Sequence, residues 1–222
     1  YQLPQSRWNL TRVEVHDGFA GDGVDTLVTT YKYEDGFHHR REREFFGYKT
    51  VTTEQRNALD NSVYRSTTQT FLNRNYYEKG LLVSEVLQDG AGKKYLETLN
   101  QYQLRDVENG LILQGQFKNS LTATVFPELT RTDKKFYEGQ AKPGINTHQR
   151  FDYDSLGNVI HFFDDGDDGT KDDVESFIHY HSDPANYIVG KADKLEVKSN
   201  GKLYRRRKAS IALGTVNLRQ DP

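Results

Sequence analysis

The stretch that decides the fold runs from Tyr31 to Val51 and reads Tyr-Lys-Tyr-Glu-Asp-Gly-Phe-His-His-Arg-Arg-Glu-Arg-Glu-Phe-Phe-Gly-Tyr-Lys-Thr-Val. Aromatic residues lie on both sides of a run of alternating charge, and Glu34-Asp35-Gly36 has the composition of a tight turn. The stretch therefore predicts two strands joined at that turn. Because side chains alternate across a strand, we expect two opposite sets, Arg40, Glu42, Glu44 and Phe46 against Arg41, Arg43 and Phe45.

The composition predicts a folded chain whose sheet is polar on at least one face. The 222 residues can bury a sizeable core, yet only 35% are hydrophobic and the mean hydropathy is −0.84. Fourteen Tyr and twelve Phe argue against disorder, which is poor in aromatic residues. The net charge of −2 argues against nonspecific nucleic-acid binding, and the absence of Cys excludes a disulfide scaffold or a thiol nucleophile.

Hairpin signals recur along the chain, and no long amphipathic helix interrupts them. The clearest turns are Gln88–Gly92, Asp154–Gly157 and Asn200-Gly201, each flanked by alternating or β-branched residues. Residues 54–61 are the best candidate for a short helical or irregular connection, since they favour helix over strand. The strands expected from these signals are 10–15, 26–33, 64–72, 81–87, 95–104, 111–117, 121–126, 131–137, 148–153, 158–163, 174–181, 194–199 and 202–212. The fold class predicted is all-β, an extended antiparallel sheet of long hairpins over residues 1–222.

Four motifs, in order, carry a resemblance to a known family. The first is Tyr31–Val51 itself, and the second is Phe126-Pro127-Glu128-Leu129-Thr130-Arg131-Thr132. The third, Phe151-Asp152-Tyr153-Asp154-Ser155-Leu156-Gly157-Asn158-Val159, is a YD repeat as it stands. The fourth is the acidic run Phe163–Asp173, followed by Asn186-Tyr187-Ile188-Val189-Gly190. Together they resemble the B component of insecticidal Tc toxin complexes and the Salmonella plasmid virulence proteins, both kin to the Rhs/YD-repeat proteins.

The resemblance implies a structural function. In that superfamily hairpins wind into a hollow shell, so this chain would be a curved section of the wall of a secreted toxin and a fragment of a much longer protein. It implies other shell segments, a C-component-like or Rhs-type partner polypeptide and an encapsulated toxin cargo as partners. We predict no cofactor, no nucleic acid and no direct membrane insertion. The alternatives are a surface adhesin or carbohydrate-binding β-module, in which exposed Tyr and Trp8 would stack on sugars, and a partial enzyme domain.

Glu42-x-Glu44 is the candidate for catalysis, because ADP-ribosyltransferases carry a Glu-x-Glu. In those enzymes a Ser-Thr-Ser strand comes before the Glu-x-Glu, whereas the nearest match here, Ser66-Thr67-Thr68, comes after it. The alternative is that both carboxylates pair with cations on neighbouring strands. We predict no enzyme activity and no catalytic residue.

Three further groups have a binding and a structural interpretation. The loop Asp164–Glu175 resembles a calcium loop in its spacing, but Gly166 stands at the third position and cannot ligate through a side chain, so a flexible acidic loop is the alternative. Arg205-Arg206-Arg207-Lys208 could bind nucleic acid, although a strand would divide it between two faces. His38-His39 and the pair His179 and His181 are the close histidines. The second pair could hold a metal if a carboxylate faced it. We predict no metal site.

Overall fold

The computed structural model describes residues 6–19, 26–113, 124–167, 169–212 and 215–220. Within these ranges every regular element is a β-strand apart from one 3-10 turn, Pro184–Asn186. Every pair of strands whose register is described is antiparallel. The prediction of an all-β antiparallel fold is therefore confirmed.

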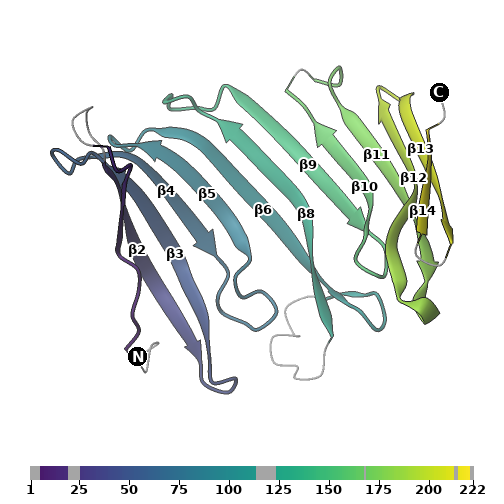
Figure 1. The fold of residues 1–222 in the computed structure, drawn as a ribbon, viewed down its shortest axis with the longest axis horizontal. Coiled ribbons are helices and arrows are strands. Elements are labelled where there is room, and N and C mark those ends of the chain that lie inside the picture. The colour runs from purple at the N-terminus through teal and green to yellow at the C-terminus, as the bar shows by residue number, and fades with distance from the viewer. Residues whose placement is uncertain (1–5, 20–25, 114–123, 168, 213–214, 221–222) are drawn as a thin grey trace. The chain divides into compact units, whose positions relative to one another are not determined.

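The chain divides into two compact units, the first made of Tyr1–Asn100 and Lys134–Ile145 and the second of Gln101–Asp133 and Asn146–Pro222. Strands in the first unit are neighbours in chain order, from β1 to β6 (Figure 1). They are β1 Arg12–His16, β2 Thr26–His39, β3 Glu44–Arg56, β4 Val63–Phe71, β5 Leu82–Asp89 and the first half of β6 Lys94–Asp106.

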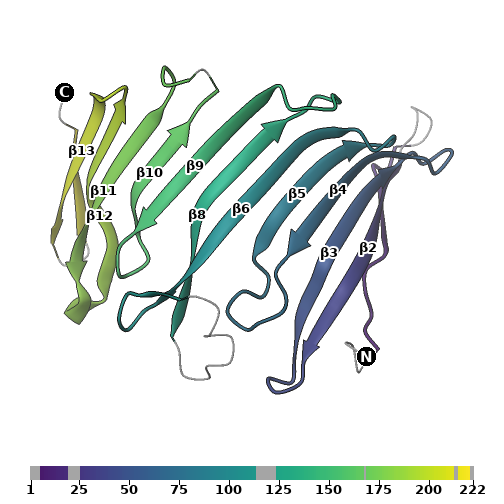
Figure 2. The same cartoon turned by 180° about the vertical axis from the view of Figure 1, so that it is seen from behind.

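The second unit also keeps chain order, with the short β7 pairing the second half of β6. Its strands are β7 Ile112–Leu113, β8 Val125–Phe136, β9 Ile145–Tyr153, β10 Val159–Asp165, β11 Val174–Asp183, β12 Ile188–Ser199, β13 Lys202–Ala212 and β14 Thr215–Gln220. Views from the two sides, in Figures 1 and 2, show no helix on either face of the described strands. The single region predicted for residues 1–222 stays a prediction.

The β2–β3 hairpin turns later than the sequence predicts. The chain reverses at Arg40–Arg43, and the pair His39 and Glu44 closes the hairpin. Asp35 instead takes a left-handed conformation (φ 53°) within β2. The register shifts between the pairs Gly36–Tyr48 and His38–Phe45, where β3 has one residue more than β2. This is a β-bulge, which twists a strand without reversing it. The prediction of a turn at Glu34-Asp35-Gly36 is therefore wrong, as is the prediction of opposite strand faces for residues 40–43.

Contacts from beyond the hairpin fix this bulge. The Asn73 side chain, only 2% exposed, donates from Nδ2 to the carbonyls of Asp35 (2.9 Å) and Gly47 (3.1 Å). Past the bulge, His39 stacks on Phe46 with ring centroids 5.1 Å apart. The carbonyls of Asp35 and Gly47 thus accept hydrogen bonds and the rings of His39 and Phe46 stack, so the extended hairpin is favoured over an early reversal.

Two further predictions are wrong in detail. β3 continues to Arg56, through the start of the expected helical connection, because Glu54 and Arg56 pair across the sheet with β2 and β4. β8 is one strand where two were expected, at 121–126 and 131–137. Part of that first strand, and most of the expected strand 111–117, lie outside the described residues.

The turns predicted at Asp154–Gly157 and Asn200-Gly201 are confirmed. Gly157 has a φ of 84°, and the Asp154 carboxylate accepts the backbone N–H groups of Leu156 and Asn158, both at 2.9 Å. Asn200 and Gly201 both have positive φ, at 50° and 72°.

We expect Gly157→Val and Gly201→Val each to lower the free energy of unfolding by about 1–3 kcal/mol, because Val is strained at positive φ. Gly157→Val should have the larger effect, since a Cβ there would lie 3.2 Å from the Phe126 ring, whereas Gly201 has nothing within 4 Å. Urea unfolding of both variants measures this. Wild-type stability in both would contradict the turn assignment.

Candidate functional site

Polar and charged side chains occupy the buried positions of both units. Among the described residues, the hydrophobic side chains that are buried are Val28, Phe46 and Leu104. The buried polar or charged residues are Glu54, Asn73, Asn75, Glu128, Thr132 and Asp133. The buried carboxylates must be paired, since an isolated buried charge is strongly unfavourable. The candidate functional feature is therefore a sheet held by ion pairs within and between its strands.

Glu54 on β3 is the centre of a cluster in the first unit. It accepts hydrogen bonds from Lys32 and Arg56, and Thr30 lies directly opposite it on β2. Arg56 also donates to Thr30 Oγ1 at 3.0 Å. Burial raises the pKa of Glu54, but the hydrogen bonds and charges of Lys32 and Arg56 outweigh burial, so the pKa lies below its ordinary value of 4.5.

Two further carboxylates are held in the same way. The hydrogen bond from Lys94 (2.8 Å) lowers the pKa of Glu97, burial opposes it, and the Tyr137 hydroxyl (2.9 Å) lowers it further. In the second unit, burial raises the pKa of Asp133, but Arg131 (2.7 Å) and His148 outweigh burial, and the pKa is lowered.

Glu128 on β8 is the most deeply buried of these groups, with no exposed surface. Arg105 on β6 binds both of its carboxylate oxygens, and Gln103 donates to Oε2 at 2.5 Å. Arg105 Nη1 also donates to the Gly110 carbonyl at 2.8 Å. This two-pronged geometry leaves Glu128 fully hydrogen-bonded, which a buried charge requires.

The lowered carboxylate pKa values predict acid sensitivity. A group whose pKa is lower folded than unfolded stabilises the fold above the unfolded pKa, and that stability is lost as pH falls through the folded pKa. The ordinary values are 4.5 for Glu and 3.8 for Asp, and the pKa of Glu54, Glu97 and Asp133 lies below them. We expect the urea midpoint to fall steadily below about pH 4.5.

Glu54→Gln tests the origin of that acid sensitivity. The variant should be less stable than the wild type at pH 7. It should also lose less stability between pH 7 and pH 3, because the substituted side chain does not take up the proton that Glu54 binds as the pH falls. Exposed Glu14→Gln is the matched control and should follow the wild-type curve. Equal pH slopes for Glu54→Gln and the wild type would contradict the assignment.

The structure separates the candidate catalytic pair. Glu42 lies in the Arg40–Arg43 turn, where its N–H donates to His39 Nδ1 at 3.2 Å, whereas Glu44 begins β3. Glu44 forms an ion pair with Lys79 at 2.6 Å. The expectation that both carboxylates share one strand face is wrong, because the turn lies between them.

The acidic run is divided between two strands and a loop. Asp164 and Asp165 end β10, and Glu175 lies in β11. Between them, Asp167 donates its N–H to the Asp172 carboxylate at 2.9 Å. Across the described residues no group of three His, Asp or Glu side chains is placed to hold a metal ion. Asp168, which belongs to the candidate calcium loop, lies outside the described residues.

Two of the candidate histidines, and one arginine of the basic run, have structural partners. His179 Nδ1 lies 2.6 Å from Asp193, and His39 stacks on Phe46. The Arg206 guanidinium donates to Glu196 at 2.7 Å, as cross-strand pairing predicts. A register shift between His179 and Tyr180 interrupts the regular alternation near the expected His179 and His181 pair.

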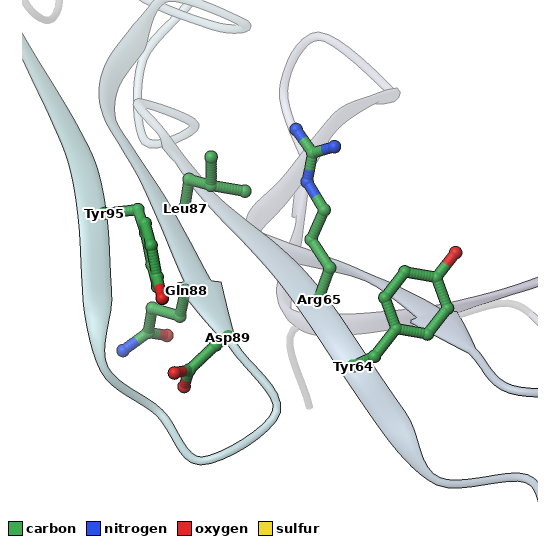
Figure 3. A pocket seen from close by; sticks show the side chains of 6 residues that line it. All are labelled: Tyr64, Arg65, Leu87, Gln88, Asp89 and Tyr95. Carbon is green, nitrogen blue, oxygen red and sulfur yellow. The ribbon is translucent and has the colours of Figure 1, made fainter. Parts of the chain in front are cut away.

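A shallow pocket on the first unit gathers aromatic and polar side chains. It has a volume of 280 Å³ and is lined by Tyr64, Arg65, Leu87, Gln88, Asp89 and Tyr95. Figure 3 shows Tyr95 and Tyr64 on either side, with Leu87, Gln88 and Asp89 on the strand between them. Both tyrosines are exposed, at 51% for Tyr64 and 39% for Tyr95. The sequence predicts exposed Tyr side chains but not that Tyr64 and Tyr95 line one pocket. The pocket depends on which strands are neighbours in the sheet.

Comparisons with known proteins agree with this architecture. Residues 1–80 match the family model described as the insecticide toxin TcdB middle/N-terminal region. The resemblance to the Tc toxin B component is confirmed. The comparison with curated proteins gives no match. No helix in the described part of the chain is long and apolar enough to cross a membrane.

Solved structures extend the likeness over most of the chain. The structure of TcdB2-TccC3-TEV aligns with a TM-score of 0.66 at 13% identity, over 95% of this chain and 15% of that one. TcdB2-TccC3 without its hypervariable C-terminal region gives 0.65 at 14% identity, over 96% and 15%. TcdB2-TccC3-Cdc42 gives 0.65 at 14% identity, over 90% and 14%. The chain thus has the fold of about one seventh of those longer chains.

Proposed function

We propose that the chain is a structural wall segment of a secreted bacterial toxin shell, Tc-B-like or Rhs-like, which encloses or helps deliver a toxic polypeptide. The observation that carries this proposal is the polar character of the buried positions in the sheet. Its buried positions hold paired charges such as Glu128 with Arg105, and hydrophobic side chains are few among the buried residues. A sheet stabilised in this way can have water on both faces, as a wall between two compartments requires.

The mechanism we propose is containment. A cargo polypeptide that meets hydroxyl and charged side chains finds little apolar surface on which to collapse or bind. On β3 and β4, Thr52 and Thr68 lie directly opposite each other with their hydroxyls 3.4 Å apart. The match of residues 1–80 to the model of the insecticide toxin TcdB middle/N-terminal region supports this function.

The partners follow from the same proposal. The similar structures pair TcdB2 with TccC3, which supports a C-component-like or Rhs-type partner for this chain. Other segments of the same shell would extend the sheet at its edge strands, because unpaired strand edges are otherwise open to aggregation. We propose an extracellular location and no binding of nucleic acid.

A protease-protection experiment tests containment. The full-length protein that contains this chain is co-expressed with its C-component-like partner, and digestion of the cargo segment is followed over time. We expect slow digestion in the complex and rapid digestion of the partner alone. An Arg105→Met variant, which weakens the wall, should speed digestion. Equal digestion with and without the chain would overturn the proposal.

The proposal includes the absence of catalysis by Glu42 and Glu44. Glu44 is in an ion pair whose side chains are 47% and 28% exposed, and such pairs contribute at most about 1 kcal/mol. We expect Glu42→Gln with Glu44→Gln to lower stability by no more than that and to leave full-length toxicity unchanged. Toxicity and NAD hydrolysis assays measure this. A folded double variant that lost a measurable ADP-ribosyl transfer rate would establish the enzyme alternative.

The second candidate function is carbohydrate binding, which the pocket between Tyr64 and Tyr95 favours. Exposed aromatic faces beside Gln88, Asp89 and Arg65 combine stacking surfaces with polar groups that could bind sugar hydroxyls. Glycan-array binding of the wild type and of Tyr95→Ala tests it. Binding that Tyr95→Ala abolishes and Tyr31→Ala retains would support this function.

A further inference from the structure

Arg65 lines the pocket on the first unit, and across the described residues its guanidinium has no hydrogen bond or ion pair. It lies on β4 opposite Asp89 on β5 and Gln55 on β3. The residues two places away along β4, Val63 and Thr67, are uncharged. Asp89 is therefore the carboxylate that cross-strand pairing would give to Arg65. The absence of that ion pair leaves a cation at the pocket.

The β5–β6 turn holds the carboxylate of Asp89 away from Arg65. Asp89 Oδ1 accepts the backbone N–H groups of Ala91 and Lys93, both at 2.9 Å. Figure 3 shows the Asp89 and Arg65 side chains pointing in different directions. Both hydrogen bonds end on Oδ1, so Oδ2 can accept a hydrogen bond from a ligand hydroxyl. A cation and a hydrogen-bond acceptor thus line one pocket without neutralising each other.

Close backbone contacts hold the walls of the pocket in place. Gly90 comes so near to β4 that a Cβ there would overlap the Val63 carbonyl oxygen. Beside β6, the Tyr137 N–H donates to the Tyr95 carbonyl at 2.9 Å. A Cβ at Gly139 would lie 3.4 Å from the Tyr95 hydroxyl, so the chain at Gly139 supports the Tyr95 ring. A site whose walls are already ordered has less entropy to lose when a ligand binds.

The other groups around the pocket favour a sugar over other ligands that carry a carboxylate. The hydroxyls of Tyr64 and Tyr95 and the Gln88 amide can pair with hydroxyl groups, of which a sugar ring has several. Tyr95 and Leu87 add apolar surface against which the ring can pack. The volume of 280 Å³ lies just below the usual range for ligand pockets, about 300–1,000 Å³, so the site suits a small ligand such as one sugar unit.

We propose that this pocket binds an acidic sugar, with the sugar carboxylate on Arg65 and the sugar ring against Tyr95. This inference rests on carbohydrate binding, the second candidate function, and names the class of sugar. A guanidinium can donate two parallel hydrogen bonds to a carboxylate, and such charge-assisted bonds are stronger than neutral ones. Asp89 Oδ2 accepts a ring hydroxyl in the same arrangement. Sialic acids and uronic acids both carry the required carboxylate.

Calorimetric titration of the complete 222-residue chain with two matched pairs of sugars tests the site. The pairs are sialyllactose with lactose, and methyl glucuronide with methyl glucoside. In one pair we expect the acidic sugar to bind about tenfold more tightly than its neutral counterpart, the effect of one charge-assisted contact. Arg65→Gln should remove that difference and keep the binding of the neutral sugar. Arg41→Gln is the matched control, because Arg41 is an exposed arginine in the β2–β3 turn and does not line the pocket. Circular dichroism of each variant shows whether it is folded.

A preference for either acidic sugar that Arg65→Gln removes and Arg41→Gln keeps supports the site and identifies its sugar. Equal binding of acidic and neutral sugars, lost in Tyr95→Ala, would overturn the carboxylate contact and leave carbohydrate binding intact. Absence of binding by all four sugars would overturn both the acidic-sugar site and the second candidate function. An equal loss of preference in Arg41→Gln would overturn the site, since it indicates nonspecific attraction to positive charge. None of these results bears on containment, which is measured by protease protection.

Discussion

Arg105→Met should lower the free energy of unfolding by about 3–5 kcal/mol, because it leaves the Glu128 carboxylate buried without its cation. Glu128 has no exposed surface, and Arg105 binds both of its oxygens across β6 and β8. Gln103 would remain, but a single neutral donor does not compensate a buried charge. Urea unfolding followed by circular dichroism measures the loss.

Two further variants show whether the loss comes from burial of the charge. The exposed pair of Arg12 and Glu14, at 46% and 42%, is the control, and Arg12→Met should change stability by less than about 1 kcal/mol. Combining Arg105→Met with Glu128→Leu should recover much of the stability, since the buried charge is then absent. If Arg105→Met alone were as stable as the wild type, Glu128 would not be an ion-paired buried carboxylate.

Gly90→Ala is expected to cost about 3 kcal/mol, at the upper end of the usual cost of overpacking. A Cβ at Gly90, in the β5–β6 turn, would overlap the Val63 carbonyl oxygen and lie 2.9 Å from its carbon and 3.2 Å from Tyr64 Cα. These are backbone atoms, which cannot rotate away as a side chain can. The turn or the start of β4 must therefore move.

The control for Gly90→Ala is Gly144→Ala. Gly144 has no atom within 4 Å of a Cβ and no positive φ, so its replacement should leave stability within about 0.5 kcal/mol of the wild type. Thermal unfolding of both variants measures the difference. Equal melting temperatures would show that β4 and the β5–β6 turn are not packed as closely as described.

The sequence by itself determined the fold class and most of the turns. Asp154–Gly157 and Asn200-Gly201 form where they are predicted, because Gly, Asn and Asp set the local backbone whatever the strands later contact. The resemblance carried by Tyr31–Val51 is confirmed by the family match over residues 1–80. The turns and the motif depend on residues that are close together in the sequence.

Only the tertiary structure decided where the first long hairpin reverses and which residues the carboxylates meet. The turn at Arg40–Arg43 depends on Asn73, 38 residues after Asp35, and Glu128 meets Arg105 across 23 residues. The ion pair of Arg206 with Glu196 depends in the same way on the pairing of β12 and β13. Strand register is set by contacts summed over whole strands, and a shift of one residue moves every side chain to the other face, so no local pattern contains it.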